Sequence, residues 1–337
     1  MKTWGQALRI LAAGLAGIGM AGVAHAEVDE VKLVSQYGIG YMQLTMMNRD
    51  KLVEKHLAKA GLAATKVTWA KVAAGAAAND ALLSGNLHFA SGGTGPALIL
   101  WDKTRGNLDV RGVGALASMP NLLITRNPKV KTIRDLTDKD RIAMAGAGSS
   151  VQTTYLQMAV SKEYGIENYK KLNPLMVGLP HPEGLRALLS GTGEINSQFT
   201  SPPFQNYALE APGITTVLNS YDVMGGRNTF LMVWSTNKFR EANPKTFRAV
   251  FDAMKEATAS INADKKRAAE MYVQEGGGKE SVDKIFKMMS DPQVNYTMSP
   301  ERLLAYAQFM NQVGTLKNKP AAWQDLFFPE LHDQPGS

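Results

Sequence analysis

Short apolar runs alternate with longer segments of helical periodicity along most of this chain. The runs at residues 31–35 and 66–71 predict strands, and the segment 42–57 between them has apolar residues near helical spacing. Such alternation is typical of α/β proteins in which mostly parallel sheets are covered by helices. Further strands are predicted at residues 87–91, 122–125, 141–145, 175–178, 195–199, 216–218 and 230–234.

The pattern becomes almost purely helical beyond Pro244. Helices are predicted at residues 244–262, 264–274, 280–289 and 300–313, each preceded or started by Pro, Asp or Ser. A chain of 337 residues that is 45% hydrophobic is long enough for two domains with ordinary cores. We therefore expect two α/β lobes and a helical C-terminal region.

An internal repeat supports two lobes of similar build. Residues 81–85 have the same sequence as residues 187–191, and each copy leads into a predicted strand, a turn of small residues and a proline. The shared pentapeptide alone is also explained as a common helix ending, in which glycine supplies a left-handed cap. We favour a structural repeat because the elements that follow the two copies also correspond.

The first 26 residues are interpreted as a cleaved signal peptide. Lys2 and Arg9 are the charged residues there, an apolar run covers residues 10–23, and small residues at Ala24 and Ala26 precede Glu27. A membrane-anchoring helix is the weaker alternative because the run is shorter than about 18 residues. We expect an exported, periplasmic protein that begins at Glu27.

Composition argues against several classes of function. The formal net charge is +7, and Lys2 and Arg9 supply two of these charges. The densest basic run, residues 265–267, is too short for a nucleic-acid-binding stripe, so we expect no nucleic-acid partner. The chain has no cysteine, which excludes thiolate metal sites, a cysteine nucleophile and disulfides.

Catalytic and metal-binding motifs are also missing. The histidines beyond residue 26 form no pair at metal-chelating spacing, and neither a Gly-x-Ser-x-Gly motif nor a Walker loop occurs. Asp138 and Asp140 lie in a lysine-rich turn, where solvation is the simpler explanation. We expect no metal, no cofactor and no enzymatic activity.

Loops that follow the predicted strands are the places where an open α/β sheet binds ligands. The turn at residues 146–150 has the strongest case, because backbone amides, a helix dipole and the hydroxyls of Ser149 and Ser150 converge there. It suits a small oxyanion. Either serine taken alone is equally well explained as a helix cap. A dinucleotide site is disfavoured because Val151 stands where a third glycine would be needed.

Two further side chains are candidates for contact with an anion. Arg227 lies between glycines and Asn228, and a guanidinium grips a carboxylate or sulfonate through two donors. His181 occupies a Pro-His-Pro turn after a predicted strand. The alternative for Arg227 is an exposed cation in a flexible turn. Tyr37 is a candidate wall of the pocket.

Several of these segments together resemble the solute-binding proteins of nitrate/sulfonate/taurine-type ABC importers. The resemblance rests on the export signal, the Tyr37-Gly38 loop, the segments 81–96, 148–150 and 187–204, and the helix start at Asn243-Pro244. It implies a type II periplasmic binding protein fold with a ligand cleft between two lobes. The lobes expected are residues 27–118 plus 236–337, and residues 119–235.

The resemblance also implies the partners and the site. It implies delivery of a solute to a membrane permease driven by an ATPase, and we expect a monomer. The solute expected is a small organic anion such as a sulfonate, a taurine-like compound or an aromatic carboxylate. A neutral pyrimidine, or a sensor role beside a membrane kinase, remains the alternative. By position, the resemblance implies a cleft lined by Tyr37, Gly38, Gly92, Thr94, Ser149, Ser150, Ser201 and Pro202. Gln152, His181 and Arg227, taken from the loops themselves, complete the predicted ligand-binding residues.

Overall fold

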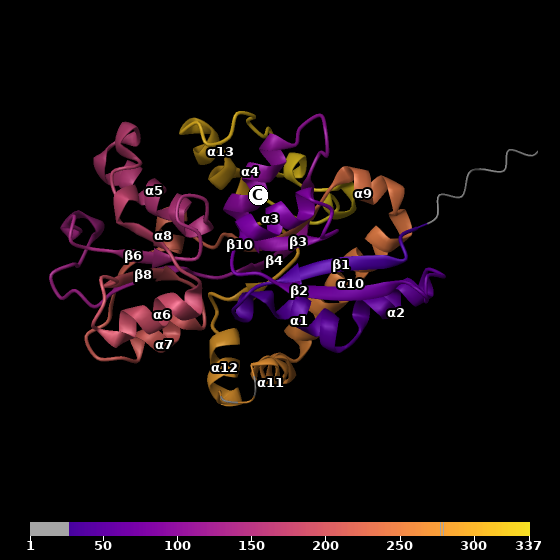
Figure 1. Cartoon of the computed structure of the whole chain (residues 1–337), viewed down its shortest axis with the longest axis horizontal. Helices are drawn as coiled ribbons and strands as arrows, with labels where there is room; N and C mark the ends of the chain where they lie inside the picture. Colours follow the sequence, from indigo (N-terminus) through magenta and orange to yellow (C-terminus); the bar gives the residue numbers. More distant parts are fainter. Residues whose placement is uncertain (1–26, 277, 279) are drawn as a thin grey trace, which may run out of the picture.

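A computed structural model describes residues 27–276, 278 and 280–337 of the chain (Figure 1). The predicted signal peptide lies outside the described residues. Strands alternate with helices up to residue 235 and helices dominate beyond it, as the sequence pattern predicts.

One group of strands forms the sheets at the centre and right of Figure 1. Strands β1 (Glu30–Ser35) and β2 (Lys66–Lys71) pair in parallel. A four-stranded sheet has the order β11-β4-β10-β3, in which β10 runs antiparallel to both neighbours. Its strands are β3 (Ala90–Gly93), β4 (Arg111–Ser118), β10 (Thr229–Ser235) and β11 (Asn295–Tyr296).

The other sheet, at the left of Figure 1, is built entirely from residues between β4 and β10. Its order is β7-β6-β8-β5-β9; β6 runs parallel to β7 and β8, and β5 runs antiparallel to β8 and β9. Its strands are β5 (Leu122–Thr125), β6 (Ile142–Met144), β7 (Met176–Gly178), β8 (Ser197–Thr200) and β9 (Thr215–Asn219). The chain thus leaves one lobe after β4 and returns through β10, which confirms the two-lobed α/β fold class.

The sheets differ from the sequence prediction in several respects. Strand β11 was not predicted, and β3 spans Ala90–Gly93 where residues 87–91 were expected. Strand β10 pairs with β3 and β4, so residues 229–235 belong to the four-stranded sheet of the first lobe, whereas the sequence predicts a second lobe that extends to residue 235. Strand β4 was not predicted at all, because Gly112 and Gly114 weaken its strand pattern.

Helices cover the sheets of both lobes. The predicted helix at 42–57 is instead two helices, α1 (Met42–Arg49) and α2 (Leu52–Lys59), because Lys51 between them has a left-handed φ of 54° that no right-handed helix can contain. The others are α3 (Gly75–Leu83), α4 (Thr94–Lys103), α5 (Val151–Tyr164), α6 (His181–Ser190), α7 (Phe204–Leu209), α8 (Ser220–Met224), α9 (Asn237–Ala242), α10 (Pro244–Ala263), α11 (Lys265–Glu275), α12 (Val282–Met289) and α13 (Leu303–Gln312).

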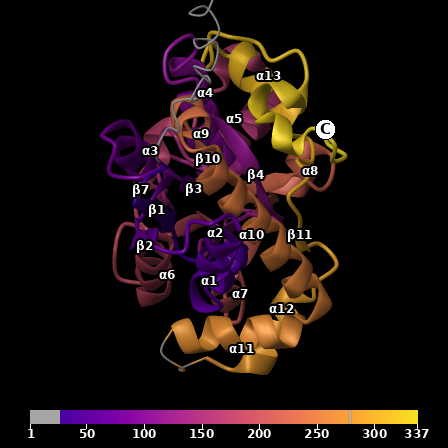
Figure 2. The same ribbon diagram turned by 90° about the vertical axis from the view of Figure 1, so that its right-hand side faces the viewer.

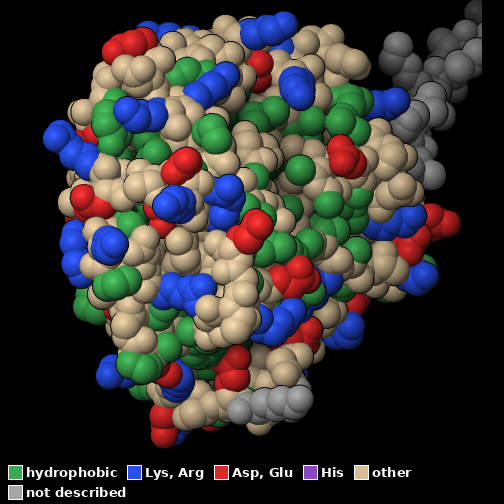
Figure 3. Space-filling view, turned by 60° about the vertical axis from the view of Figure 1, so that its left-hand side comes forward, with side chains coloured by type: hydrophobic (Ala, Val, Ile, Leu, Met, Phe, Trp, Pro, Cys, Tyr) green, Lys and Arg blue, Asp and Glu red, His purple; other side chains and the backbone are tan. Residues whose placement is uncertain are grey.

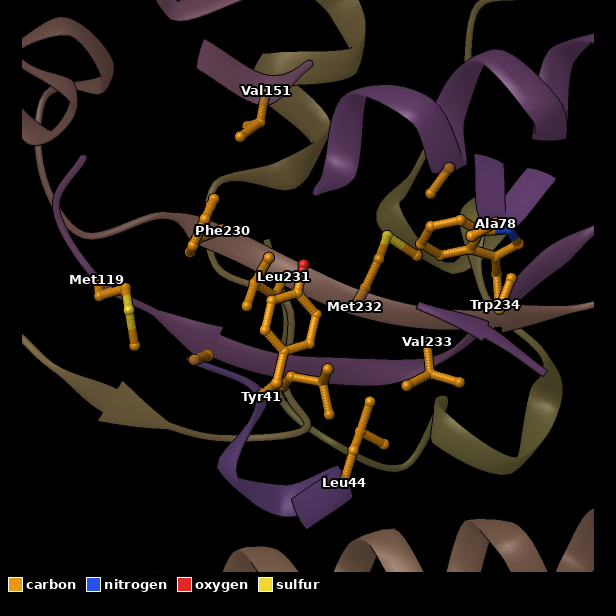
Figure 4. Packing of buried hydrophobic residues seen from close by; sticks show 14 of the residues in the cluster. Tyr41, Leu44, Ala78, Met119, Val151, Phe230, Leu231, Met232, Val233 and Trp234 are labelled. Atoms are coloured by element: carbon orange, nitrogen blue, oxygen red, sulfur yellow. The ribbon is translucent and has the colours of Figure 1, made fainter. Parts of the chain in front are cut away.

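The main hydrophobic core surrounds strand β10, whose residues are all buried. Figure 4 shows consecutive β10 residues from Phe230 to Trp234 among side chains from other elements. The Trp234 indole is fully buried, and its Nε1 donates to Asn79 Oδ1 at 3.0 Å. Helix α10 crosses in front of β4 and β10 in Figure 2. The returning strand is therefore the element around which the first lobe packs.

Charged side chains of both signs are interspersed on the face in Figure 3, where the second lobe comes forward. Among the residues described, no helix has both the length and the apolar character needed to cross a membrane.

Gly112→Ala should destabilise the protein. A Cβ atom at this position would lie 2.4 Å from Phe327 Cδ1 and 2.7 Å from Met232 Cε, so the packing over β4 must shift. We expect the free energy of unfolding to fall by about 1–2 kcal/mol, measured by urea denaturation. Gly193→Ala is the control because a Cβ there meets nothing within 4 Å. Equal denaturation midpoints for the two variants would show that the Gly112 contact is not tight.

Candidate functional site

A pocket lies where residues of the two lobes face each other. The volume that a water-sized molecule can reach is about 30 Å³, within about 370 Å³ of unfilled space that includes open solvent. Four of the lining residues, Tyr41, Val151, Phe230 and Leu231, are visible around β10 in Figure 4. The full lining is Gln36, Tyr41, Ala74, Gly75, Ala76, Gly93, Pro96, Ala145, Gly146, Ser149, Ser150, Val151, Gln152, His181, Phe230 and Leu231.

The N-termini of α3, α4, α5 and α6 converge on this pocket, two from each lobe. Their first residues or N-caps are among the lining residues. The first backbone N–H groups of a helix have no partner within the helix, and its N-terminus carries roughly half a positive charge. The first turns of α3, α4 and α5 contain no acidic residue, and the N-caps of α3 and α4 make no side-chain cap. The dipoles of α3, α4 and α5 therefore favour a negative charge in the pocket, whereas the first turn of α6 carries Glu183.

Ser150 is the N-cap of α5. Its Oγ accepts a hydrogen bond from the backbone N–H of Thr153 at 3.2 Å, and the Thr153 hydroxyl donates to the carbonyl oxygen of Gly146 at 3.2 Å. The capping interpretation of Ser150 is thus confirmed, and these bonds fix the 146–150 turn at the wall of the pocket. Contact between Ser150 and a ligand stays a prediction.

His181 is the first residue of α6 and is held by three contacts. Its Nδ1 lies 2.8 Å from Thr200 Oγ1, its ring stacks on Phe204 with centroids 5.6 Å apart, and its carbonyl oxygen accepts from Gln198 Nε2 at 3.0 Å. Burial lowers the pKa of His181 to about 4. The ring is therefore neutral at neutral pH, and none of these contacts uses Nε2.

No charged side chain lines the pocket among the residues that the structure describes. Burial raises the pKa of the Tyr41 phenol, so this hydroxyl also stays neutral. The amide nitrogens of Gln36 and Gln152 donate to Ser91 O at 2.8 Å and to Asn121 Oδ1 at 2.7 Å. Any attraction of the pocket for an anion thus comes from helix dipoles and backbone N–H groups and not from charged side chains. Within the described part of the chain, no three His, Asp or Glu side chains gather so as to hold a metal ion.

Four predicted ligand residues, Ser149, Ser150, Gln152 and His181, line the pocket. Two others lie close behind the wall. A Cβ atom on Gly92 would be 2.7 Å from Gln36 Nε2 and 3.2 Å from Gly75 Cα, and Thr94 is the fully buried first residue of α4. Both positions therefore support the wall without lining the pocket.

The remaining loop predictions fall outside the pocket lining. Tyr37 is 40% exposed, and its ring centroid lies 4.9 Å from Lys71 Nζ. A Cβ atom on Gly38 would be 3.1 Å from the carbonyl oxygen of Pro202, so these loops of opposite lobes touch. Ser201, which precedes Pro202, is buried.

Arg227 is not brought to the pocket. Its guanidinium donates to the carbonyl oxygen of Pro292 at 3.0 Å and lies 3.8 Å from the Glu301 carboxylate, and the side chain is 45% exposed. Gly225 and Gly226 precede it in left-handed conformations and turn the chain before β10 begins. The cation therefore pairs with the C-terminal region and does not face the ligand pocket.

Most of the first-lobe residues that line the pocket are absent from the predicted ligand-binding residues. The α3 start at Ala74, Gly75 and Ala76 has no polar side chain, so nothing in its residue types signals chemistry. The available signal was positional: a helix that starts directly after a parallel strand points its N-terminus toward the ligand edge of the sheet. Other lining residues outside the predicted ligand set are Gln36, Tyr41, Gly93, Pro96, Ala145, Gly146, Val151, Phe230 and Leu231.

Several solved structures are similar to this chain over most of its length. The alkanesulfonate-binding protein SsuA from Xanthomonas axonopodis pv. citri, bound to MOPS, has a TM-score of 0.69 at 16% identity, covering 89% of this chain and 98% of that one. The periplasmic nitrate-binding protein NrtA from Synechocystis PCC 6803 has a TM-score of 0.68 at 13% identity, covering 92% and 86%. The ligand-binding component of an ABC-type import system from Staphylococcus aureus has a TM-score of 0.63 at 16% identity, covering 90% and 98%.

These likenesses show the fold, which is that of periplasmic binding proteins. No curated protein sequence matches the chain. The model of the NMT1-like family matches residues 24–274. The chain therefore belongs to the NMT1-like family.

Proposed function

We propose that this protein is the periplasmic solute-binding component of an ABC importer and that it captures a small organic anion, such as a sulfonate, a taurine-like compound or an aromatic carboxylate. The observation that carries the proposal is the convergence of four helix N-termini on one pocket lined from both lobes. Helix N-termini bind anions through free N–H groups and the helix dipole. The binding proteins with similar structures support the transport role.

The protein can capture a solute by closing if the solute makes better contacts in the closed state than in the open state. A ligand that touches both walls of the pocket favours the state in which the lobes are close together, and hinge closure is the usual result. From the strand pairing we place the lobes at 27–118 with 229–337, and at 119–228. Asn121 lies just after the chain crosses into the second lobe. Its backbone N–H donates to Ser220 Oγ at 2.9 Å, and its Oδ1 accepts from Gln152 at the pocket. Asn121 thus connects the start of the second lobe with its wall of the pocket.

The same proposal includes delivery of the solute to a permease and its ATPase, a monomeric state, and export of a protein that begins at Glu27.

Small-angle scattering tests whether the two lobes close on the ligand. A saturating ligand should reduce the radius of gyration, and an unchanged radius despite proven binding would favour a rigid, preformed pocket.

One observation favours a second candidate, a neutral heterocycle such as a pyrimidine. The described residues that line the pocket include no cationic side chain to neutralise an anion. A thermal-shift screen separates the two candidates with ethanesulfonate, taurine, benzoate, nitrate and an aminopyrimidine, followed by calorimetry. We expect the organic anions to raise the melting temperature without being turned over. Stabilisation by the aminopyrimidine alone would replace the anion with the neutral ligand.

Ser150→Ala should weaken both the turn and the binding of an anion. Loss of the N-cap costs about 1 kcal/mol of stability, and loss of a charge-assisted hydrogen bond to the ligand would weaken binding by roughly tenfold or more. Calorimetry with the ligand identified by the screen measures the second effect. Arg227→Ala is the control, because its guanidinium bonds to Pro292 and Glu301. Parent-like binding by Ser150→Ala, or a loss of binding in Arg227→Ala, would contradict this placement of the anion.

A further inference from the structure

We propose that His181 links solute capture to proton uptake. An anion bound among the helix N-termini draws a proton onto the His181 ring, so the site binds the anion more tightly as the medium becomes more acidic. The inference rests on the proposed function, because it requires an anionic ligand. It adds a specific role for one pocket residue and a pH response of the site.

The ring is fixed in the orientation that this role needs. His181 lines the pocket, stacks on Phe204, and has its Nδ1 2.8 Å from Thr200 Oγ1. The threonine hydroxyl can donate to a bare Nδ1 or accept from a protonated one, so protonation of the ring does not break this contact. The contacts leave Nε2 free, and Nε2 is the ring atom through which His181 can donate to a ligand in the pocket.

In the ligand-free pocket the His181 ring is neutral. Burial disfavours the charged form and lowers the pKa to about 4, and the positive N-terminus of α6 acts in the same direction. Tyr41, the other titratable residue among those described in the lining, stays neutral because burial raises its pKa. The charged residues nearest in sequence on the adjoining helices do not line the pocket; they are Glu183 and Arg186 of α6 and Glu210 after α7.

A bound anion raises the pKa of His181. An opposite charge within about 4–6 Å favours the charged form of a base and raises its pKa. Because the pKa of His181 is then higher in the complex than in the free protein, binding takes up a proton and the affinity rises with acidity. Among the described residues that line the pocket, no carboxylate or cation competes with this effect, and Glu183, in the same first turn as His181, is exposed to solvent.

Calorimetry with ethanesulfonate tests the proposal, because this probe stays ionised throughout the pH range used. We expect binding about tenfold tighter at pH 5.0 than at pH 7.5. At pH 5.0 the heat should depend on the ionisation enthalpy of the buffer, with an uptake of close to one proton. His181→Asn retains an acceptor for the Thr200 hydroxyl but cannot titrate, so its affinity should be nearly independent of pH. His332→Asn, at an exposed histidine outside the pocket, should behave like the parent.

The outcomes separate the two proposals. If ethanesulfonate fails to bind the parent at either pH, the sulfonate function and the His181 role both fall. If ethanesulfonate binds with equal affinity at the two pH values and without proton uptake, the anion site stands and the role of His181 is rejected. Should His181→Asn not fold, as judged by circular dichroism, the buffer dependence of the heat in the parent decides by itself.

Discussion

Ala76→Asp should weaken the binding of an anionic solute by roughly a hundredfold. Ala76 is the second residue of α3, is exposed, and lines the pocket. Two like unit charges about 5 Å apart repel by about 3 kcal/mol at an effective dielectric constant of about 20. The same carboxylate stabilises α3 by about 0.3–1 kcal/mol, because a negative charge suits the first turn of a helix. Reduced affinity in a protein that is at least as stable therefore identifies electrostatic repulsion and excludes misfolding.

Ala76→Asn is the matched control because it has nearly the same shape without the charge. Calorimetry with ethanesulfonate should show much weaker binding for Ala76→Asp than for Ala76→Asn, while thermal denaturation shows both variants folded. If the two variants bind ethanesulfonate equally well, the anion does not lie among the four helix N-termini. If both variants bind an aminopyrimidine as well as the parent does, and ethanesulfonate binds neither the parent nor the variants, the ligand is the neutral heterocycle and not the anion.

The fold was predictable because its strands and helices have strong local patterns. The run 66–71 has enough apolar and β-branched residues to predict β2 with its observed ends, and α10, α11 and α12 begin where Pro, Asp or Ser indicates a start. Helix α13 begins at Leu303, three residues after the predicted start, behind a left-handed Arg302. Strand β4 could not be predicted from its local pattern, because at least one of its glycines is required by a contact with a residue far along the chain. Gly112 leaves room for Phe327, a residue far along the chain, and no local pattern reveals that contact.

The site was predictable only where side-chain chemistry and position coincide. Ser149 and Ser150 stand at a helix start that follows a strand, so residue type and topology indicate the same place. The α3 wall is alanine and glycine and contributes backbone N–H groups, which the residue types do not distinguish from those of any other helix. Arg227 shows the opposite error: its chemistry suits an anion, but tertiary contacts with Pro292 and Glu301 take it elsewhere.

The stability of the ligand-free protein should fall between about pH 6.5 and pH 4 because of His181. The pKa of this buried ring is about 4 in the folded protein, against 6.5 as its ordinary value. Between these values the unfolded chain binds a proton that the folded protein does not, so acidification favours unfolding. Each pKa unit of difference corresponds to about 1.4 kcal/mol, and the full contribution is therefore about 3 kcal/mol.

His181→Asn isolates this contribution. The pKa of His88 is also lowered by burial and by Lys32. Burial acts to raise the pKa of Asp140, but hydrogen bonds from Thr137, Asn127 and Asn196 together outweigh it and lower this pKa. Both groups make the parent less stable in acid, but they are present in the variant as well. Urea denaturation at several pH values should therefore show that, from pH 7 to pH 4, the parent loses about 3 kcal/mol more unfolding free energy than His181→Asn does. A difference that stays constant over this range would mean that His181 titrates normally in the folded protein, and the neutral ring on which the proton-linked site depends would not exist.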